Sequence, residues 1–333
     1  KKSVSVDLKT PKGKEIIFKL IKKSDVFISN IRKSALSRLG FDHKTFVKYN
    51  NKIITAFAVG FSSNGPYRDL PAYDDIIQAA SGMASYQEAY SDQPSYTSGA
   101  TADKATGLML ALSVVSSLFK RNKDNNNLEL EVPMFETMVD FTLVEHLYGH
   151  NFIPPKDEPV YPRQSSPNRK PYKTKDGFIA VLPYNDEQWL RFLKFIKKEH
   201  LIKTKKFSTL ENRNKNVDEL YSLLVKELKK EKTNFWIKKL REIDIPSMKV
   251  NKPKDLFVDE HLKKTNFFRT YKHSTEGDLM YPRLPVYFNN ETDNETKFEA
   301  PNLGNRTKEV LLDLGYDKNE IENLRKEKVI FFE

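Results

Sequence analysis

The sequence predicts an α/β protein whose larger domain is built on a parallel sheet, and three observations lead to this prediction. Strand-like and helix-like segments alternate between residues 4 and 148, a pattern that requires crossover helices between parallel strands. The run Ile53 to Val59 is apolar on both faces, as in a strand covered by helices. At 333 residues the chain is longer than one core usually supports, so we expect a smaller second domain.

The first elements have clear local signals. Val4, Val6 and Leu8 alternate as in a half-buried strand, and Thr10 and Pro11 form the N-cap and first position of a helix that carries Ile16, Ile17, Leu20 and Ile21 at helical spacing. Asp25 to Ile28 is a second predicted strand, followed by a short helix from Ser34 to Leu39 that ends at Gly40.

A long helix is predicted after the Ser-, Pro- and Gly-rich loop Ser91 to Thr101. It begins near Asp103, ends at Lys120 and Arg121, and is apolar on nearly every side, so we expect it inside the core. A strand from Leu128 to Val132 and a helix from Met134 to Tyr148 follow.

The proline-rich segment Pro154 to Pro171 predicts a crossing into a second unit. The further predicted elements are a strand at 177–181, helices at 187–197 and 217–231, a helix around Trp236, and helices at 255–264 and 307–314 with a loop-rich stretch between them.

Composition narrows the functional classes. A net charge of +11 and a pI near 9.3 fit either an anionic partner or a basic solvated surface. The absence of cysteine excludes disulfides, thiolate zinc sites and a cysteine nucleophile, and it fits a cytoplasmic protein. The longest uncharged apolar stretch, Ala105 to Phe119, is too short to span a bilayer. The chain opens at Lys1 without a signal peptide, and we expect its natural start to lie upstream.

Asp103 is the leading candidate for chemistry. It lies between a small-residue loop and the long helix, where free backbone N–H groups and the helix dipole favour a negative charge. One interpretation is a helix N-cap. The other is a nucleophilic carboxylate, sheltered from water, that attacks an activated acyl carbon.

Other polar groups have weaker signals. Asn30, Arg32 and Arg38 follow a strand end, where ligands of parallel sheets bind, and guanidinium groups suit phosphate; they could equally be surface residues. Tyr73 precedes Asp74 and Asp75, which are either active-site groups or helix caps.

Three further patterns are less specific. His146 and His150 share a helical face but lack the glutamate of a zinc protease motif, so no metal site is predicted. The basic and aromatic residues between Tyr161 and Lys175 resemble a nucleic-acid stripe in composition only. Neither a Walker loop nor a GxGxxG motif is present.

Taken together, the motifs resemble those of the class III coenzyme A transferases, the family of formyl-CoA transferase and carnitine CoA-transferase, which also includes the α-methylacyl-CoA racemases. The matching segments, spread in order along nearly the whole chain, are residues 1–9, 25–32, 64–68, Tyr73-Asp74, Ser81-Gly82, 102–107, 171–181, 303–304 and 314–316.

The resemblance implies a mechanism and a set of contacts. Asp103 is similar to the family nucleophile, which forms a mixed anhydride with the acyl group, then an aspartyl-CoA thioester, and then passes CoA to a carboxylate. The residues that resemble contacts to CoA are Lys2, Asn30, Arg32, Arg38, Tyr73 and Met134. Coenzyme A is thus a substrate, and no tightly bound cofactor or metal is expected.

Tyr73 stands where the racemases carry an acid/base histidine. Because an ordinary tyrosine is a poor proton shuttle at neutral pH, this favours the transferase over the racemase. Two departures from the family pattern are Ile31, in place of a phenylalanine, and Asn305-Arg306-Thr307, in place of Glu-His-Thr.

The resulting expectation is a Rossmann-like large domain from residues 1–167, a small α+β domain from 168–247, and a segment 248–333 that returns to the large domain. The resemblance also implies an interlocked homodimer without membrane or nucleic-acid partners. The alternatives are an epimerase of CoA esters and a non-catalytic protein that binds CoA or nucleic acid. Exchange of a carboxylate into a CoA thioester would indicate the transferase, and deuterium uptake at the α-carbon without acyl exchange would indicate the epimerase. Strongly salt-dependent binding to nucleic acid without acyl transfer would indicate the non-catalytic protein.

Overall fold

The computed structural model describes residues 1–287, 289 and 300–332. In this part of the chain, three short parallel strands form the sheet that organises the larger half of the molecule. They are β2 (Val26–Ser29), β3 (Ile54–Val59) and β4 (Leu128–Pro133), in the order β2-β3-β4. The register pairs Ser29 with Phe57 and Val59 with Pro133, so the carboxyl ends of all three strands lie along one edge.

Helices cover this sheet as the alternating pattern predicts. They are α1 (Pro11–Lys23), α2 (Lys33–Leu39), α3 (His43–Tyr49), α4 (Asp74–Ala80), α5 (Met83–Tyr86), α6 (Thr101–Asp124) and α7 (Met134–His146). Thr10 caps α1 by accepting a hydrogen bond from the Gly13 N–H, and α2 ends at Gly40 in a left-handed conformation, both as predicted. The aromatic residues Phe27, Phe41, Phe46 and Phe57 pack between α1, α2, α3 and the sheet.

Residues 172–245 have a hydrophobic core of their own. Its elements are β5 (Tyr172–Lys173), β6 (Phe178–Val181), α8 (Asp186–Phe195), α9 (Leu210–Lys215), α10 (Val217–Leu228), α11 (Thr233–Glu242) and β7 (Ser247–Lys249). Trp189, Phe192, Leu224 and Trp236 lie at the centre of this core. The sheet is antiparallel, in the order β5-β6-β7. This separate core supports the predicted small domain, whose boundaries stay a prediction.

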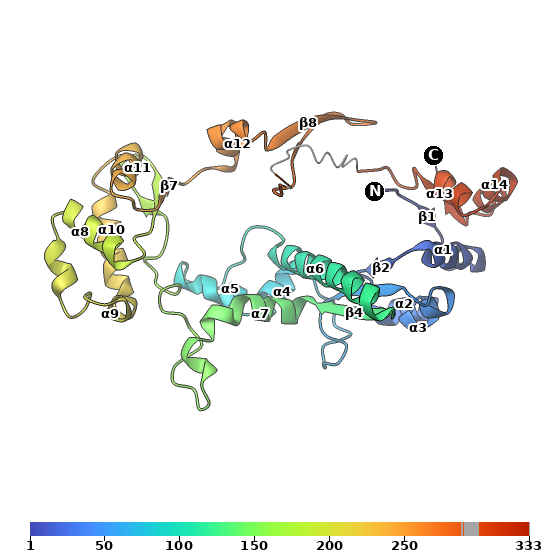
Figure 1. Ribbon diagram of the computed structural model, residues 1–333, viewed down its shortest axis with the longest axis horizontal. Coiled ribbons are helices and arrows are strands. Elements are labelled where there is room, and N and C mark those ends of the chain that lie inside the picture. Colours follow the sequence, from blue (N-terminus) through green and yellow to red (C-terminus); the bar gives the residue numbers. More distant parts are fainter. Residues whose placement is uncertain (288, 290–299, 333) are drawn as a thin grey trace.

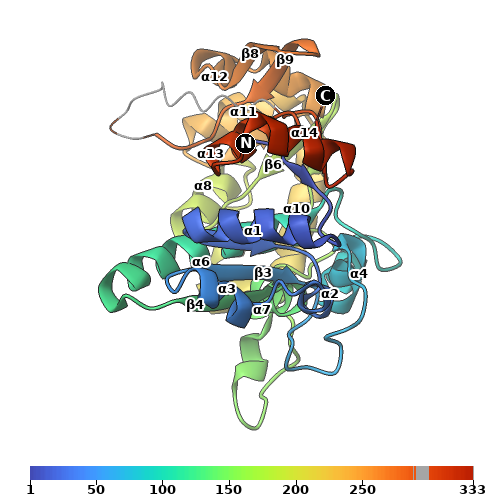
Figure 2. The same cartoon turned by 90° about the vertical axis from the view of Figure 1, so that its right-hand side faces the viewer.

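The chain then returns to its beginning. After α12 (Glu260–Lys264) and the antiparallel pair β8 (Phe268–His273) and β9 (Gly277–Pro282), it forms α13 (Thr307–Asp313), α14 (Lys318–Lys326) and β10 (Ile330–Phe331). The hairpin occupies part of the stretch that we expected to be rich in loops, and the predicted helix from residue 255 is shorter because a 3-10 helix precedes it. Figures 1 and 2 show α13 and α14 beside α1 and the N-terminus.

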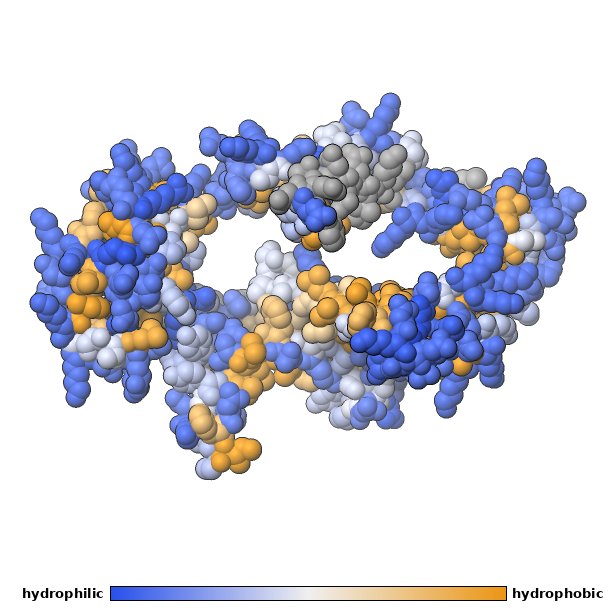
Figure 3. Space-filling model, in the orientation of Figure 1, coloured by the Kyte–Doolittle hydropathy of each residue, from blue (hydrophilic) through white to orange (hydrophobic). Residues whose placement is uncertain are grey.

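The first strand has a different partner from the one expected. β1 (Ser5–Val6) pairs antiparallel with β10, outside the parallel sheet. Ile16 of α1 packs with Leu311, Ile321 and Ile330 in a cluster that joins the two ends of the chain. The molecule therefore forms an open ring, and Figure 3 shows openings at its centre that no side chains fill.

The expectation that α6 lies within the core is wrong for this chain. α6 packs on β3, β4 and α7, but the opposite face leaves Leu108, Leu112, Val115 and Phe119 between 62% and 74% exposed. We call these four residues the α6 stripe. Figure 3 shows an apolar patch over α6 at the edge of an opening. In the described part of the chain, α6 is also the one helix with the length and hydropathy of a membrane span, which on its own is weak support for one.

Gly304 lies where the two ends of the described chain meet, so a substitution there tests the closure of the ring. Its φ is +71°, and a Cβ there would lie 2.5 Å from the Phe331 carbonyl oxygen, whereas a Cβ on Gly40, with φ +83°, would meet nothing within 4 Å. Gly40→Ala should cost about 1 kcal/mol from its left-handed backbone alone. Gly304→Ala should cost roughly 2 kcal/mol more, because β10 must also shift. Equal melting temperatures of the two variants would contradict this account of the closure.

Candidate active site

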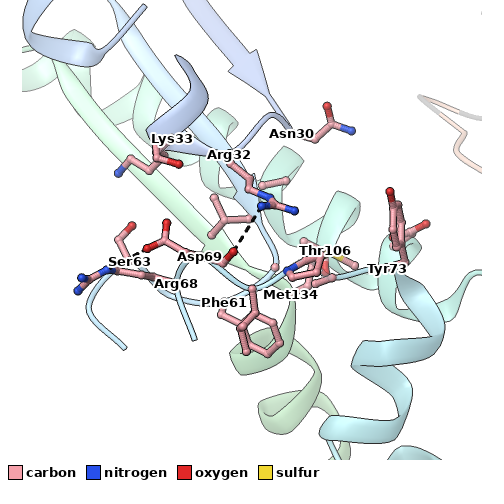
Figure 4. A pocket seen from close by; sticks show the side chains of 18 of the residues that line it. Asn30, Arg32, Lys33, Phe61, Ser63, Arg68, Asp69, Tyr73, Thr106 and Met134 are labelled. Atoms are coloured by element: carbon pink, nitrogen blue, oxygen red, sulfur yellow. Dashed lines mark hydrogen bonds and ion pairs between the residues drawn. The ribbon is translucent and has the colours of Figure 1, made fainter. Parts of the chain in front are cut away.

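A cavity of about 840 Å³ lies at the carboxyl edge of the parallel sheet. The segments just after the three strands reach its wall through Asn30, Gly60 and Met134. The first turn of α6 adds Asp103, and the loop before α4 adds Tyr73. In open parallel sheets ligands bind at this edge, because the connections diverge there and leave a crevice. Four of the predicted site residues in addition to Asp103 therefore share one cavity: Asn30, Arg32, Tyr73 and Met134 (Figure 4).

Asp103 is the third residue of α6, and Ala100 occupies the cap position. The N-cap interpretation is therefore wrong, because the helix begins earlier than we expected. The side chain of Asp103 is exposed at the cavity, so this chain alone does not give it the shelter that we expected. The carboxylate can be reached by a ligand in the cavity.

The backbone at Asp103 is held by another acid. Its N–H donates to Asp74 Oδ1 at 3.0 Å, and Asp74 Oδ2 accepts from Gln78 Nε2 at 2.6 Å. Asp74 and Gln78 lie one turn apart on α4, so neither the sequence order nor a helix pattern joins them to Asp103. In the sequence, Asp74 is either a helix cap or an active-site group, and no motif singles out Gln78. The only available signal for Gln78 was its position four residues after Asp74, on the same helix face.

The basic residues around the cavity have different surroundings. Arg32 donates from Nη1 to the Asp69 carbonyl oxygen at 3.4 Å (Figure 4), and Arg68 forms an exposed ion pair with the Asp69 carboxylate at 3.5 Å. Both guanidinium groups therefore lie near the cavity with modest restraints. Exposed ion pairs of this kind contribute little and are readily exchanged for a ligand.

Lys33 is held more firmly by the protein itself. Its ammonium group lies 2.7 Å from Glu129 and 3.1 Å from Glu131. Burial acts to lower the pKa of Lys33, but hydrogen bonds and charge from Glu129 and Glu131 outweigh it and raise that pKa. Burial acts to raise the pKa of Glu131, but hydrogen bonds from Ser63 and Lys33 lower it overall. The three charges support the wall of the cavity.

Two predicted contacts lie outside the cavity wall. Arg38 is exposed at the end of α2 and does not line it. Lys2 forms ion pairs with Glu309 at 2.8 Å and Asp313 at 3.5 Å, both on α13. Tyr73 lines the cavity but is 78% exposed, at its rim. The structure thus brings Arg32 and Asn30 to Asp103 and leaves Lys2 and Arg38 farther out.

Two of the weaker patterns have structural roles. The His146 ring stacks on Tyr86 at a centroid distance of 3.8 Å, and its Nδ1 accepts from the Tyr161 N–H. Within the described ranges, no group of three acidic, histidine or cysteine side chains could hold a metal ion. In the basic and aromatic segment, Arg169 donates to the Tyr90 hydroxyl and Arg163 to the Tyr221 hydroxyl. Both arginines are therefore engaged in hydrogen bonds within the protein, which weakens the interpretation of this segment as a nucleic-acid-binding stripe.

Fold and site together define an α/β protein with a cavity at the carboxyl edge of a parallel sheet, lined by a carboxylate and guanidinium groups. The sequence model of CoA-transferase family III matches residues 1–307, and the chain belongs to this family of enzymes. The resemblance seen in the sequence is thereby confirmed.

Curated relatives cover nearly the whole chain. It is 28% identical to (R)-2-hydroxy-4-methylpentanoate CoA-transferase of Clostridioides difficile, over 99% of this chain and 83% of the relative. It is 27% identical to cinnamoyl-CoA:phenyllactate CoA-transferase of Clostridium sporogenes, over 99% and 81%. Human succinyl-CoA:glutarate CoA-transferase is 26% identical, over 97% and 74%.

Solved structures share the fold. A CAIB/BAIF family protein from Brucella suis superposes with a TM-score of 0.73 at 23% identity, covering 94% of this chain and 81% of that one. A protein from Mycobacterium tuberculosis gives a TM-score of 0.75 at 20% identity, over 91% and 80%. The open ring of this chain thus belongs to a fold already seen in crystals.

His146 predicts a pH dependence of stability. Burial lowers the pKa of His146 below its ordinary value of 6.5, and the positive charge of Arg169 adds to this, although Glu145 opposes it. The unfolded chain therefore binds more protons below about pH 6.5, and stability should fall as the pH falls from there through the lowered pKa of His146. His146→Phe keeps a ring against Tyr86 but cannot titrate, so its melting temperature should fall less steeply over this range.

The exposed His200 provides the control for this measurement. His200→Phe should leave the slope of melting temperature against pH as in the parent protein. A slope that is also unchanged in His146→Phe would assign the acid sensitivity to other groups.

Proposed function

We propose that this chain is a CoA-transferase that moves coenzyme A from an acyl-CoA thioester to a carboxylic acid, with Asp103 as the covalent nucleophile. The observation that carries the proposal is the position of Asp103: an accessible carboxylate in the first turn of a long helix, at a cavity that Arg32 also lines. A carboxylate is a weak nucleophile, so its position next to the thioester matters more than a base.

The proposed reaction needs no net proton transfer. A carboxylate oxygen of Asp103 attacks the thioester carbonyl, the C–S bond breaks, and a mixed anhydride and CoA thiolate form. The thiolate then attacks the aspartyl carbonyl, which releases the donor acid as its carboxylate and leaves an aspartyl-CoA thioester. The acceptor carboxylate attacks this thioester to give a second anhydride, and the thiolate then attacks the acceptor carbonyl, which restores Asp103.

Coenzyme A supplies the anionic group that the cavity suits. We propose that Asn30 and Arg32, at the end of β2, and Met134, at the end of β4, bind it beside Asp103. Guanidinium groups match phosphate oxygens, and the free N–H groups at a helix start favour developing negative charge. Lys2, Arg38 and Tyr73 would contact only the outer parts of the ligand, since they lie at or beyond the rim. No tightly bound cofactor is required.

We further propose that the active form is an interlocked homodimer in the cytoplasm. The ring has a central opening with an apolar patch over α6 at its edge (Figure 3), and the large apolar side chains of the α6 stripe are exposed. Phe141 and Val144 on the neighbouring α7 are also at least 60% exposed. A contiguous apolar surface of this kind marks an interface, and a second copy threaded through the opening would cover it. It would also shelter Asp103, which the single chain leaves exposed.

The nucleophile is tested by intact mass after incubation with cinnamoyl-CoA, succinyl-CoA and formyl-CoA, each with 2-hydroxy and dicarboxylic acids as acceptors. A CoA adduct should map to Asp103, and Asp103→Asn should lose it and reduce transfer by at least about 10³-fold. Asp75→Asn, an exposed acid on α4 outside the cavity wall, is the matched control and should keep activity. An adduct on another residue, or transfer that survives in Asp103→Asn, would overturn the assignment.

The same incubations distinguish a CoA-transferase from an epimerase of CoA esters. Deuterium uptake at the α-carbon without acyl exchange would identify an epimerase instead.

The dimer is tested at the α6 stripe. Leu112→Glu places a charge in the proposed interface, where burial without a partner is costly, and should shift the protein from dimer to monomer in light scattering. Leu210, which is 53% exposed on α9 of the smaller unit, offers the control Leu210→Glu, which should leave the mass unchanged. A parent protein that is monomeric at micromolar concentration would refute the dimer.

A further inference from the structure

The side chain of Gln78 is fully buried at the junction of α4, the loop 91–101 and the start of α6. Its carboxamide uses every hydrogen-bonding position that it has. Nε2 donates to Asp74 Oδ2 at 2.6 Å and to the Gly99 carbonyl oxygen at 3.4 Å. Oε1 accepts from the Thr97 N–H at 2.9 Å and from the Thr97 hydroxyl at 3.1 Å.

The partners fix which end of the carboxamide is which. The Thr97 N–H can only donate, so an oxygen must face it, while the carboxylate of Asp74 and the carbonyl of Gly99 can only accept, so the nitrogen must face them. No other natural side chain of this length offers two donors and an acceptor in this arrangement. Glutamate would keep the acceptor and lose both donors, and methionine would lose all of them.

Both branches of this network lead to Asp103. Through Asp74, Gln78 orients the carboxylate that accepts the Asp103 N–H at 3.0 Å. Through Thr97, it fixes the loop, and the Thr97 hydroxyl lies 2.9 Å from the hydroxyl of Thr101, the first residue of α6. The exposed turn that carries Asp103 is therefore tied to the buried side of α4 by one side chain.

We propose that Gln78 is a positioning residue for Asp103, acting through Asp74 and the loop 97–101. The proposal rests on the proposed role of Asp103 as nucleophile. Gln78 does not line the cavity and touches no reacting atom. It sets where the Asp103 carboxylate stands relative to the thioester, and a misplacement of about 1 Å in such a group costs on the order of 10²-fold in rate.

The test is Gln78→Glu, which removes the hydrogen bond donated to Asp74 and keeps the acceptor for Thr97. Near neutral pH the new carboxylate faces Asp74 and repels it, whereas its contacts with Thr97 remain. At lower pH the two acids share a proton, and the donor toward Asp74 returns. Relative to the parent protein, kcat for CoA transfer from succinyl-CoA should be about 10²-fold lower at pH 7.5 and within about 3-fold at pH 5.5, with KM little changed.

Hydrogen exchange measures the positioning without any turnover. Amides 97–106 should exchange at least about 10-fold faster in Gln78→Glu than in the parent protein at pH 7.5, and at nearly the parent rate at pH 5.5. If no donor is turned over by the parent protein, the proposed function fails, but this exchange result still supports or overturns the network. Exchange that matches the parent protein at both values of pH would overturn it.

A second variant guards against a general loss of folding. In Asp74→Asn/Gln78→Glu the donor and acceptor are exchanged, because the new amide at position 74 donates to the new carboxylate and its oxygen can still accept the Asp103 N–H. Protection of amides 97–106 should return at pH 7.5. Failure of protection to return, in a variant that melts like the parent protein, would overturn the proposal.

Gln188 provides the matched control. It is the partner of Asn185 in the capping box of α8, and its Oε1 accepts from the Tyr184 N–H, far along the chain from the cavity. Gln188→Glu should change neither the transfer profile with pH nor the exchange of amides 97–106. A pH profile that shifts equally in both variants would mean that the effect comes from added charge in general, and would contradict the proposal.

Discussion

Parallel pairing of β3 with both of its neighbours is the interaction on which the site depends. The register places the ends of β2, β3 and β4 at one edge, so that Asn30, Gly60 and Met134 meet although they are far apart in the sequence. The connection from β3 to β4 is long enough to carry α4 and α6 across the sheet. The start of α6, with Asp103, thereby arrives at the same edge. Without this pairing the acid and the guanidinium groups would have no common cavity.

The charged residues at this edge fall into two groups, one held firmly by ion pairs within the protein and one only weakly restrained. Lys33 pairs with both Glu129 and Glu131, and Glu131 also accepts a hydrogen bond from the Ser63 N–H, which holds that loop in place. Arg32 and Arg68, by contrast, make long or exposed contacts that water can replace. A cavity that binds a polyanion needs both kinds of group, since the wall must stay rigid while its own cations stay available.

Local signals in the sequence were enough for many elements. The Thr10 cap, the glycine that ends α2 and the apolar run in β3 depend on neighbouring residues, so the bounds of these elements were predicted closely. The pairing of β1 with β10 was not predictable, because each strand has two residues and the Ser5 N–H bonds to Thr307, 302 positions away. Apolar composition predicted α6 but not its surroundings, since an apolar helix face that stays exposed in the single chain looks the same in sequence as a buried one.

Some residues of the site could be predicted from local signals in the sequence, and others could not. Asp103 and Arg32 could be singled out because a helix start and a strand end are visible in the sequence. That Asp74 and Gln78 act on Asp103 depends on how a loop folds back over α4, and no periodic pattern reports such contacts. The ion pairs of Lys2 with α13 were likewise hidden, because they join the two ends of the chain.

The cluster that joins the ends of the chain also sets an order of events during synthesis. Ile16 emerges from the ribosome long before Leu311, Ile321 and Ile330, which pack against it. Domains usually form from the N-terminus onward as the chain grows. Here α1 must keep an apolar face uncovered until α13, α14 and β10 have been made. A ribosome-bound chain of this protein is therefore a natural client for chaperones, and ring closure is a late step that waits for the C-terminal helices.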